Sequence, residues 1–367
     1  DFLQRRMSPS ACIPFLWLTF VGILSTLNAD AAFSHSRSFA TLPVFSRSLR
    51  AGRARQSQPP LATATRSSRT SSQPPLACVS SALCAAGMSA LKRGLVESAV
   101  VALGVNGLGF AISAITGTQK ITDLFGTGCF VLTALNSFRS AGVPIDIASR
   151  PAFLTAAVSL WGTRLASFLF NRILKTGEDT RLTDQFQSTG GLAAFWTAQT
   201  VWCWLSLLPS TVAVYSKAAT SLTRWDAFGI ALFSLGFAFE TIADNQKWAK
   251  KQREMKGEAA KGKGDKAAKW MDEGLWRLCR YPNYFGEICV WSGLYAVAVP
   301  ALYQAYGPKM VALGALSPAF VSSLLLFVSG VPLAEKRADK RFGDDPQYQE
   351  YKKSTPLIIP DLTKVFK

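Results

Sequence analysis

The sequence predicts an all-α fold, a polytopic transmembrane helix bundle with about seven spans. Of its 367 residues, 49% are hydrophobic and only 17% are charged, whereas soluble domains carry about 25% charged residues. Several apolar runs reach the ~20 residues that a membrane-spanning helix requires. Lys and Arg are concentrated in alternate connections between these runs, which is the pattern of a polytopic protein with one positively charged membrane face.

The first 93 residues are predicted to be a targeting leader in two parts. Residues 1–31 have the features of a signal peptide, because the apolar run Cys12–Leu27 is too short for a comfortable span and precedes the cleavage signature Ala29-Asp30-Ala31. Residues 32–93 are predicted to be a disordered, transit-peptide-like leader. They are rich in Arg, Ser, Ala and Pro, with no acid between Phe33 and Arg93.

In tandem, these two parts resemble the bipartite plastid presequence of algae with secondary plastids, in which cleavage leaves an aromatic residue in an Ala-Phe context. The stretch Ala31-Ala32-Phe33-Ser34 matches that context. The resemblance implies a plastid membrane as the location, with the endoplasmic reticulum as the alternative. An ordinary signal peptide followed by a disordered secreted segment is the competing interpretation, and the long stretch without acid favours the plastid.

Residues 94–367 are predicted to form the membrane domain. Lipid offers no hydrogen-bond partners to the backbone, so the apolar runs should be helices. A soluble all-α protein is the alternative, which seven such runs in one domain disfavour. The predicted spans are Leu95–Thr116, Ile121–Phe138, Ala152–Ile173, Leu192–Tyr215, Ala227–Ala243, Tyr284–Tyr303 and Met310–Leu333.

Counting crossings places three charged stretches on one membrane face: Asn171–Gly191, Lys247–Arg280 and Ala334–Lys367. The short connections Lys217–Trp225 and Pro300–Lys309 fall on the other face. Because the first face holds most of the Lys and Arg, it should face cytosol or stroma. A soluble cofactor could therefore enter where the three stretches meet.

The formal net charge of +17 fits nucleic acid, anionic lipid or a phosphorylated ligand. The basic stretches carry no aromatic residues at stacking intervals and no nucleic-acid motif, so nucleic acid is excluded as a partner. The expected partners are the lipid bilayer and a hydrophobic small molecule. The one His, His35, lies in the leader, so we predict no His-ligated metal and no Ser–His or Cys–His nucleophile in the membrane domain.

Charged residues inside the predicted spans form the first candidate site. Arg164 lies within an apolar run and should face the bundle or a wet cavity, because a charge at the membrane centre costs at least ~2.5 kcal/mol. It could pair with Glu178, Asp179 or Glu240. Glu240 and Asp244 are four residues apart on one helix face, which suggests cation binding, polar-ligand binding or a salt bridge to Arg164.

The second candidate site surrounds a predicted helix start. Pro282 suits the first turn of a helix because its missing N–H would have no partner there. Asn283 and Tyr284 would then line a helix N-terminus, with its free N–H groups and partial positive charge. With Arg277 and Arg280 beside it, this segment is a plausible anion or phosphate site.

The third candidate site is the C-terminal tail. The run Ala334–Phe342 is predicted to be a charged helix that leaves the membrane. It is either a solvated juxtamembrane helix or a lid over a pocket at the depth of the lipid headgroups. Its polar and aromatic candidates are Glu335, Arg337, Asp339, Tyr348 and Tyr351.

From about Pro151 to Pro360, the chain resembles the steroid 5α-reductase C-terminal-like family, in its domain-of-unknown-function 1295 branch. Four ordered motifs carry the resemblance. They are W-G-x-R-L…R…G-E-D-x-R from Trp161, F-E-x-x-A-D-x-Q-K at Phe239–Lys247, G-L-W-R…R-x-P-N-Y-F-G-E from Gly274, and P-L-x-E-K-R with Y-x-x-Y-x-x-x-T…I-P in the tail.

The resemblance implies a membrane reductase that binds NADPH in a pocket built by the last spans. The implied reaction is hydride transfer to the β-carbon of an α,β-unsaturated carbonyl or similar activated alkene, followed by protonation. The implied substrate is lipid-like: an isoprenoid, a sterol or a fatty-acyl lipid. The implied cofactor-binding residues are Lys247, Trp276, Arg280, Asn283, Tyr284, Glu335, Arg337, Asp339, Tyr348 and Tyr351.

The chain departs from that family in two places. Tyr281 stands where the family often has His. Steroid-reducing members use a Glu and Tyr pair in their N-terminal half, whereas the first Tyr here is Tyr215 and the only acid between the leader and Asp123 is Glu97. The sequence therefore does not place the donor pair. The candidate catalytic replacements are Glu178, Asp179, Glu240 and Tyr284.

Two other functions stay open. A membrane methyltransferase of the isoprenylcysteine or phospholipid type shares this C-terminal architecture and uses S-adenosylmethionine. Such enzymes typically show R-H-P-x-Y-x-G followed by paired acids, whereas this chain has R-Y-P-N-Y-F-G and Glu335 followed by Lys336. A non-catalytic membrane protein that kept the fold and lost the donor is the second alternative. The motifs favour the reductase.

Overall fold

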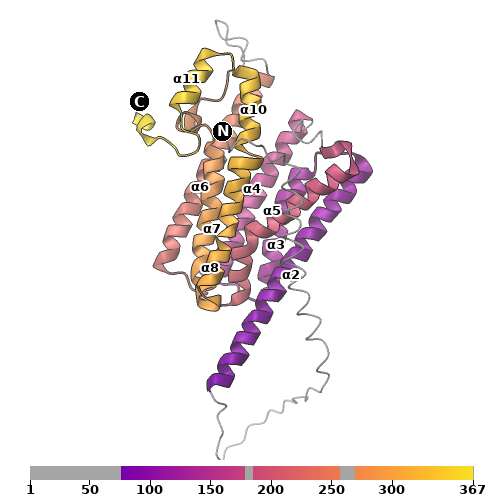
Figure 1. Cartoon of the computed structure of the whole chain (residues 1–367), viewed down its shortest axis with the longest axis vertical. Coiled ribbons are helices and arrows are strands. Elements are labelled where there is room, and N and C mark those ends of the chain that lie inside the picture. Colours follow the sequence, from indigo (N-terminus) through magenta and orange to yellow (C-terminus); the bar gives the residue numbers. More distant parts are fainter. Residues whose placement is uncertain (1–75, 178–184, 257–268, 367) are drawn as a thin grey trace, which may run out of the picture.

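The computed structural model describes residues 76–177, 185–256 and 269–366 (Figure 1). Over these ranges the chain is helical and forms no β-strand; a single bridge joins Ser149 to Ser221. The α-helices are α2 Leu76–Thr116, α3 Thr122–Ala141, α4 Arg150–Thr176, α5 Thr189–Ser216, α6 Arg224–Met255, α7 Pro282–Tyr306, α8 Pro308–Gly314, α9 Leu316–Ser323, α10 Val331–Phe342 and α11 Pro346–Ser354. Shorter helical turns are η1 Gln185–Gln187, η3 Gly274–Arg277, η4 Leu324–Val328 and η5 Leu362–Phe366.

The prediction of an all-α polytopic membrane protein is confirmed. All seven apolar runs lie in helices, and five helical stretches of the described chain are long and apolar enough to cross a membrane. Helices α3 and α5 do not reach that apolarity, because α3 carries Asp123 and Arg139 and α5 is rich in Ser, Thr and Trp. The five stretches are Gly87–Thr116, Arg150–Thr176, Arg224–Met255, Pro282–Tyr306 and Pro308–Phe342.

Two predicted boundaries differ from the structure. Helix α2 begins at Leu76, inside the stretch assigned to the leader, because the sequence from Leu76 to Met88 is rich in the helix formers Ala and Leu. The predicted span Met310–Leu333 is not one α-helix but the succession α8, α9, the π-helical turn η4 and the start of α10. The signal peptide and most of the predicted leader lie outside the described residues.

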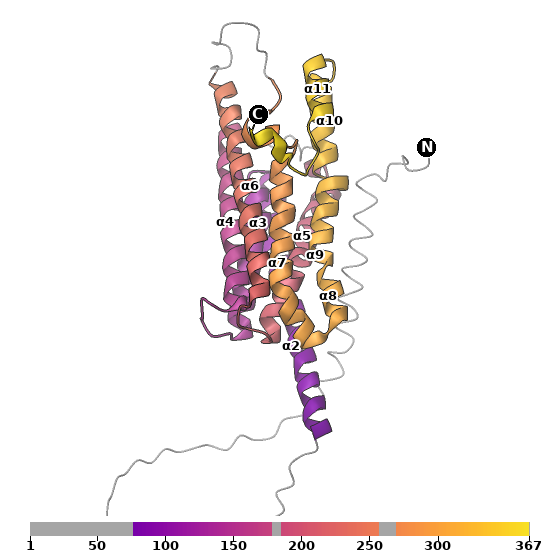
Figure 2. The same cartoon turned by 90° about the vertical axis from the view of Figure 1, so that its left-hand side faces the viewer.

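The helix ends follow local sequence rules. Ser149 and Ser188 cap α4 and α5 by accepting hydrogen bonds from Ala152 N at 3.3 Å and Gly191 N at 3.1 Å. Helix α7 begins at Pro282, as predicted. Neighbouring helices run in opposite directions, so the ends of α4 and α6, the start of α7, and helices α10 and α11 gather at one end of the bundle (Figures 1 and 2). The predicted convergence of the charged stretches is thus confirmed for their described parts.

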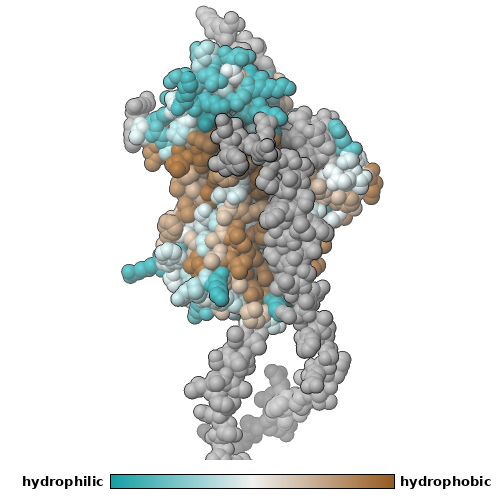
Figure 3. All heavy atoms as spheres, in the orientation of Figure 1, coloured by the Kyte–Doolittle hydropathy of each residue, from teal (hydrophilic) through white to brown (hydrophobic). Residues whose placement is uncertain are grey.

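The surface agrees with a membrane environment. On the face seen in Figure 3, apolar side chains cover the middle of the bundle, and hydrophilic side chains cover the end that carries α10 and α11. Inside the bundle, the rings of Phe130, Trp161 and Trp291 pack at centroid distances of 5.0–5.4 Å. Aromatic pairs at these separations add to the stability gained from burial.

Helices α6 and α7 approach each other closely at two pairs of glycines. Gly229 and Gly236 of α6 face Gly293 and Gly286 of α7. A Cβ on Gly236 would lie 2.5 Å from the Gly286 carbonyl oxygen, and one on Gly286 would lie 2.5 Å from the Glu240 amide nitrogen. Because small residues let transmembrane backbones touch, these glycines set the distance between the two helices. Figure 2 shows α7 between α6 and the α8–α10 run.

A buried ion pair fixes the other end of the bundle. Arg150 donates to Asp226 through Nη2 at 2.6 Å and Nε at 3.1 Å, and both side chains are completely buried. Asp226 also accepts from the Thr223 amide at 2.6 Å and the Thr223 hydroxyl at 2.8 Å. The pair therefore ties the start of α4 to the start of α6.

We predict that Gly286→Ala will lower the thermal midpoint of the detergent-solubilised protein, since the new methyl group must push α6 away from α7. The cost should be roughly 1–3 kcal/mol, as for other overpacked interiors. Gly104→Ala on α2 is the matched control, because a Cβ there would meet no atom within 4 Å. Equal melting of the two variants would contradict the proposed contact.

We also predict that Asp226→Ala will unfold far more readily than the wild type, because it leaves the Arg150 charge buried without its carboxylate. Breaking a buried pair in this way costs about 3–5 kcal/mol. Chemical denaturation of the purified protein measures the effect, with the exposed Asp344→Ala as control. A decrease of less than about 1 kcal/mol in the free energy of unfolding would show that the ion pair does not stabilise this end of the bundle.

Candidate functional site

A group of charged side chains lies inside the bundle, between α4 and α6. Arg164 donates through Nη1 to Glu240 at 3.0 Å and forms an ion pair through Nη2 with Asp244 at 2.9 Å. The indole N–H of Trp161 donates to the other oxygen of Glu240 at 3.0 Å. The sequence left three possible partners for Arg164, and the structure pairs it with Glu240. Glu178 and Asp179 lie outside the described residues.

Helix α7 adds two more polar groups to this cluster. Asn283 donates through Nδ2 to Asp244 at 3.3 Å, while its buried Oδ1 has no partner in the described part of the chain. Glu287, one turn further along α7, lies close enough to interact electrostatically with Glu240 and Asp244. We call Arg164, Glu240, Asp244, Asn283 and Glu287 the inner cluster. Ionisable groups inside a membrane protein are expensive, and they commonly mark functional positions.

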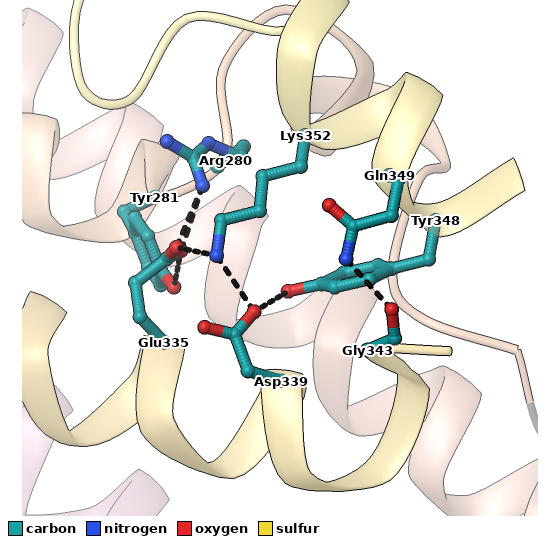
Figure 4. A network of polar contacts seen from close by, with 8 residues as sticks. All are labelled: Arg280, Tyr281, Glu335, Asp339, Gly343, Tyr348, Gln349 and Lys352. Atoms are coloured by element: carbon teal, nitrogen blue, oxygen red, sulfur yellow. Dashed lines mark hydrogen bonds and ion pairs between the residues drawn. The ribbon is translucent and has the colours of Figure 1, made fainter. Parts of the chain in front are cut away.

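A second polar group lies at the end of the bundle that carries α10 and α11. Arg280 donates through Nη1 to both oxygens of Glu335, at 2.9 and 2.8 Å. Tyr281 donates its hydroxyl to Glu335 at 2.5 Å, and Lys352 of α11 contacts the same carboxylate at 2.9 Å. Lys352 also binds Asp339 at 2.6 Å (Figure 4). We call these five residues the surface network.

Tyrosines in and beside the surface network keep their protons. Burial, followed by the hydrogen bond to Glu335, raises the pKa of Tyr281 well above its usual range. Burial, followed by the charges of Glu335 and Asp339, raises the pKa of Tyr348 to about 12. Tyr348 donates to Asp339 at 3.3 Å. Both phenols are thus hydrogen-bond donors to carboxylates at neutral pH.

Aromatic rings lie around the start of α7. Trp276 donates its indole N–H to Ala243 O at 3.1 Å, and the Lys247 ammonium lies 4.7 Å from the centre of the Trp276 ring. Tyr351 donates to Trp276 O at 2.8 Å. Tyr284 stacks on Tyr281 with centroids 5.3 Å apart and planes inclined by 10°. These rings offer flat surfaces beside the charged groups.

The chain beyond α11 closes over this region. Arg280 N donates to Pro356 O at 2.9 Å, and Tyr281 N donates to Leu357 O at 3.1 Å. Further along, Asp361 N donates to Leu278 O at 2.9 Å. The tail is therefore held by backbone hydrogen bonds to the segment that precedes α7.

A hollow of about 450 Å³ opens near the end of α6, beside η3. Its lining is polar and of mixed charge, because Arg253 is paired with Glu273 at 2.8 Å. The other lining residues are Gln246, Ala249, Gln252, Lys256, Met271 and Gly274. Its volume lies in the range of small-molecule sites in proteins. Gln246 also fixes η3, because its Oε1 accepts from Leu275 N at 3.0 Å.

The predicted cofactor-binding residues gather around the start of α7, with a single exception, and none of them lines that hollow. Arg280, Glu335, Asp339 and Tyr348 share hydrogen bonds or ion pairs, and Lys247, Trp276 and Tyr351 form a connected group. Asn283 belongs to the inner cluster, and Tyr284 stacks beside the surface network. Arg337 is exposed and lies on the other side of α10 from Glu335.

A family model described as "Protein of unknown function (DUF1295)" matches residues 109–355. The chain belongs to the DUF1295 family. No curated protein and no solved structure matches the chain. Both the inner cluster and the surface network lie within the residues that define this DUF1295 domain, whereas the first part of α2 lies outside them.

The DUF1295 chain also contains a Glu–Tyr pair that sequence analysis did not place. Tyr215 of α5 donates its hydroxyl to Glu97 of α2 at 2.5 Å, and Arg93 donates to the same carboxylate at 2.7 Å. Glu97 lies about 28 Å along α2 from Thr116, at 1.5 Å per residue. Because Thr116 is at the end of the bundle that carries the surface network (Figure 1), this pair lies toward the opposite membrane face.

Two residues of the polar groups were expected only as neighbours of the predicted site, not as cofactor-binding or catalytic residues: Lys352 in the C-terminal tail and Glu287 after the predicted helix start. The contact of Trp161 with the inner cluster was not predicted, because Trp161 entered only as the start of a motif. Glu287 could have been found from its spacing, since it follows Asn283 by four residues and so shares its helix face. Trp161 could not, because its indole nitrogen meets Glu240 only through the packing of α4 against α6.

We predict that Glu335→Gln will loosen the tail, because the neutral amide no longer compensates Arg280 and Lys352. Trypsin should cut the segment after residue 342 several-fold faster than in the wild type. Glu350→Gln, on the exposed side of α11, is the matched control, and trypsin should cut this variant at the wild-type rate. Equal rates for all three proteins would mean that Glu335 does not hold the tail.

Proposed function

We propose that this DUF1295 protein is a membrane-embedded, NADPH-dependent reductase that saturates an activated C=C bond in a lipid-like substrate. One observation carries the proposal. Helices α6 and α7 support two polar groups at different depths, and the surface network at the membrane face adjoins the inner cluster below it. NADPH has charged phosphates, which suit the surface network at the membrane face. It also has an uncharged reactive ring that carries an amide, which suits the inner cluster below.

The residues present suit such a ligand in three respects. Arg280 is a cation directly before the N-terminus of α7, which is a favourable place for phosphate oxygens, and Lys247 adds a second cation over the Trp276 ring. Trp276 and Tyr284 provide flat aromatic faces. Two buried polar atoms, Arg280 Nε and Asn283 Oδ1, lack partners in the described chain and could serve a ligand, since buried polar atoms normally make hydrogen bonds.

Each group has a distinct task in this proposal. Bound NADPH would supply the hydride. Arg280, Lys247, Trp276 and Asn283 hold and orient the cofactor, and the tail excludes water from above. Reduction also needs a proton donor, and Glu240 and Tyr284 are the described candidates. Trp161 and Arg164 hold the Glu240 carboxylate in a fixed orientation, which proton transfer requires, and Glu240 would have to take up a proton before it could donate one.

The proposed substrate is an isoprenoid, sterol or fatty-acyl lipid, because the site lies in a bundle that lipid surrounds. The proposed location is a plastid membrane, and the endoplasmic reticulum is the alternative. This part of the proposal depends on the composition of residues 1–93. Localisation of a fluorescent fusion of the full chain would distinguish the two membranes.

We predict that Asn283→Ala will weaken NADPH binding roughly tenfold, the loss expected for one or two buried hydrogen bonds. Isothermal titration calorimetry of the purified protein in nanodiscs measures the affinity. Asn245→Ala, on the exposed side of α6 next to Asp244, is the matched control and should bind as the wild type does. Unchanged affinity in Asn283→Ala would contradict the assignment of this residue.

The same titrations separate the proposed function from its rivals. Saturable binding of S-adenosylmethionine and none of NADPH would overturn the reductase in favour of a methyltransferase. Turnover is tested by NADPH oxidation in the presence of unsaturated lipid extracts. A protein that binds NADPH but never oxidises it above background would match a non-catalytic member of the fold.

A further inference from the structure

Helix α10 separates its charges by sign. Glu335 and Asp339, four residues apart, point toward Arg280 and Lys352 (Figure 4). Four basic residues, at positions 336, 337, 340 and 341, follow the same i, i+4 spacing on the other side of the helix. All four of these side chains are exposed: Lys336, Arg337, Lys340 and Arg341. We call them the outer basic face.

Within the described residues, the acids of the chain do not pair with the outer basic face. In the part of the chain that the structure describes, no ion pair involves Lys336, Arg337 or Lys340. The Arg341 guanidinium lies 5.0 Å over the ring of Phe342, its neighbour in sequence. Four cations within two helical turns thus have only solvent or an external anion to neutralise them.

The position of this face along the helix identifies the external anion. Helix α10 ends the candidate span Pro308–Phe342, and the apolar side chains that precede the basic residues are exposed: Phe327 by 74% and Leu333 by 39%. Lys336 lies only about 4.5 Å along the helix from Leu333, at 1.5 Å per residue. The cations therefore begin where the exposed apolar side chains of the span end, on the helix that belongs to the hydrophilic end of the bundle (Figures 1 and 3).

We propose that the outer basic face of α10 binds the phosphates of anionic lipid headgroups. The cations lie at headgroup depth directly beyond lipid-facing apolar side chains, so acyl chains and headgroup can be engaged together. The face points away from the surface network, so its ligand is distinct from the proposed dinucleotide. The inference does not rest on the proposed reductase activity.

The test compares two variants with the same net charge in nanodiscs of equal phosphatidylglycerol and phosphatidylcholine. One is Lys336→Gln, Arg337→Gln, Lys340→Gln and Arg341→Gln. The control replaces four other exposed cations by Gln, at Lys120, Lys217, Arg224 and Lys309. Native mass spectrometry after detergent transfer measures how much of each lipid the protein retains.

We expect the first variant to retain phosphatidylglycerol at least tenfold less than the wild type, because each of the four cations near the surface strengthens anionic-lipid binding several-fold. The control should retain it as the wild type does. Equal retention in both variants would overturn the proposal. If the first variant folds poorly, the salt dependence of the wild type is the test. Binding to exposed cations should weaken with rising salt, so phosphatidylglycerol retention that does not fall with rising salt would also overturn the proposal.

A further experiment repeats the lipid-retention measurement on the wild type with inorganic phosphate added at constant ionic strength. Lipid retention that is unchanged by phosphate supports a headgroup site whose binding includes the acyl chains. Displacement of the lipid by millimolar phosphate would show a soluble-anion site and overturn the assignment to lipid.

Discussion

The close contact between α6 and α7 is the constraint on which the rest of the site depends. Gly236 and Gly286 bring the two backbones so near that the Glu240 amide lies where a Gly286 side chain would be. At that separation, side chains from the second half of α6 and from the first turns of α7 lie within contact distance of one another. Asp244 can therefore reach Asn283, and the segment before α7 can reach α10 and the tail.

The contact also explains why several ionisable groups can be kept within an apolar bundle. A lone Arg164 or Glu240 would lose its hydration without a compensating partner, at a cost of several kcal/mol. Together with Trp161 and Asp244 they satisfy one another through two hydrogen bonds of 3.0 Å and an ion pair of 2.9 Å. A cluster that costs this much to assemble is better explained by a task than by stability, since apolar side chains would pack the same space at lower cost.

Sequence patterns predicted much of this arrangement because they report local properties. Apolar run length predicted the helices, Pro282 predicted the start of α7, and crossing order predicted which charged stretches meet. The pairing of side chains depends on helix rotation and packing, which no local pattern encodes. Arg150 with Asp226 and Glu97 with Tyr215 were therefore missed. Helices α3 and α5 are less apolar than the other five predicted spans, and they owe their place in the bundle to packing as well as to hydropathy.

Glu335 links the tail to any ligand of the surface network. Its carboxylate already compensates Arg280, accepts from Tyr281 and binds Lys352. A phosphate that binds Arg280 must compete with this carboxylate or join it, and in either case the Lys352 contact from α11 changes. The tail is also joined to Arg280 and Tyr281 through Pro356 O and Leu357 O. A change at the Glu335 carboxylate therefore alters the contacts that hold the tail. If the reductase proposal is correct, cofactor entry and tail position are therefore coupled through one side chain, and the protease sensitivity of the tail should report cofactor binding as well as the Glu335 substitution.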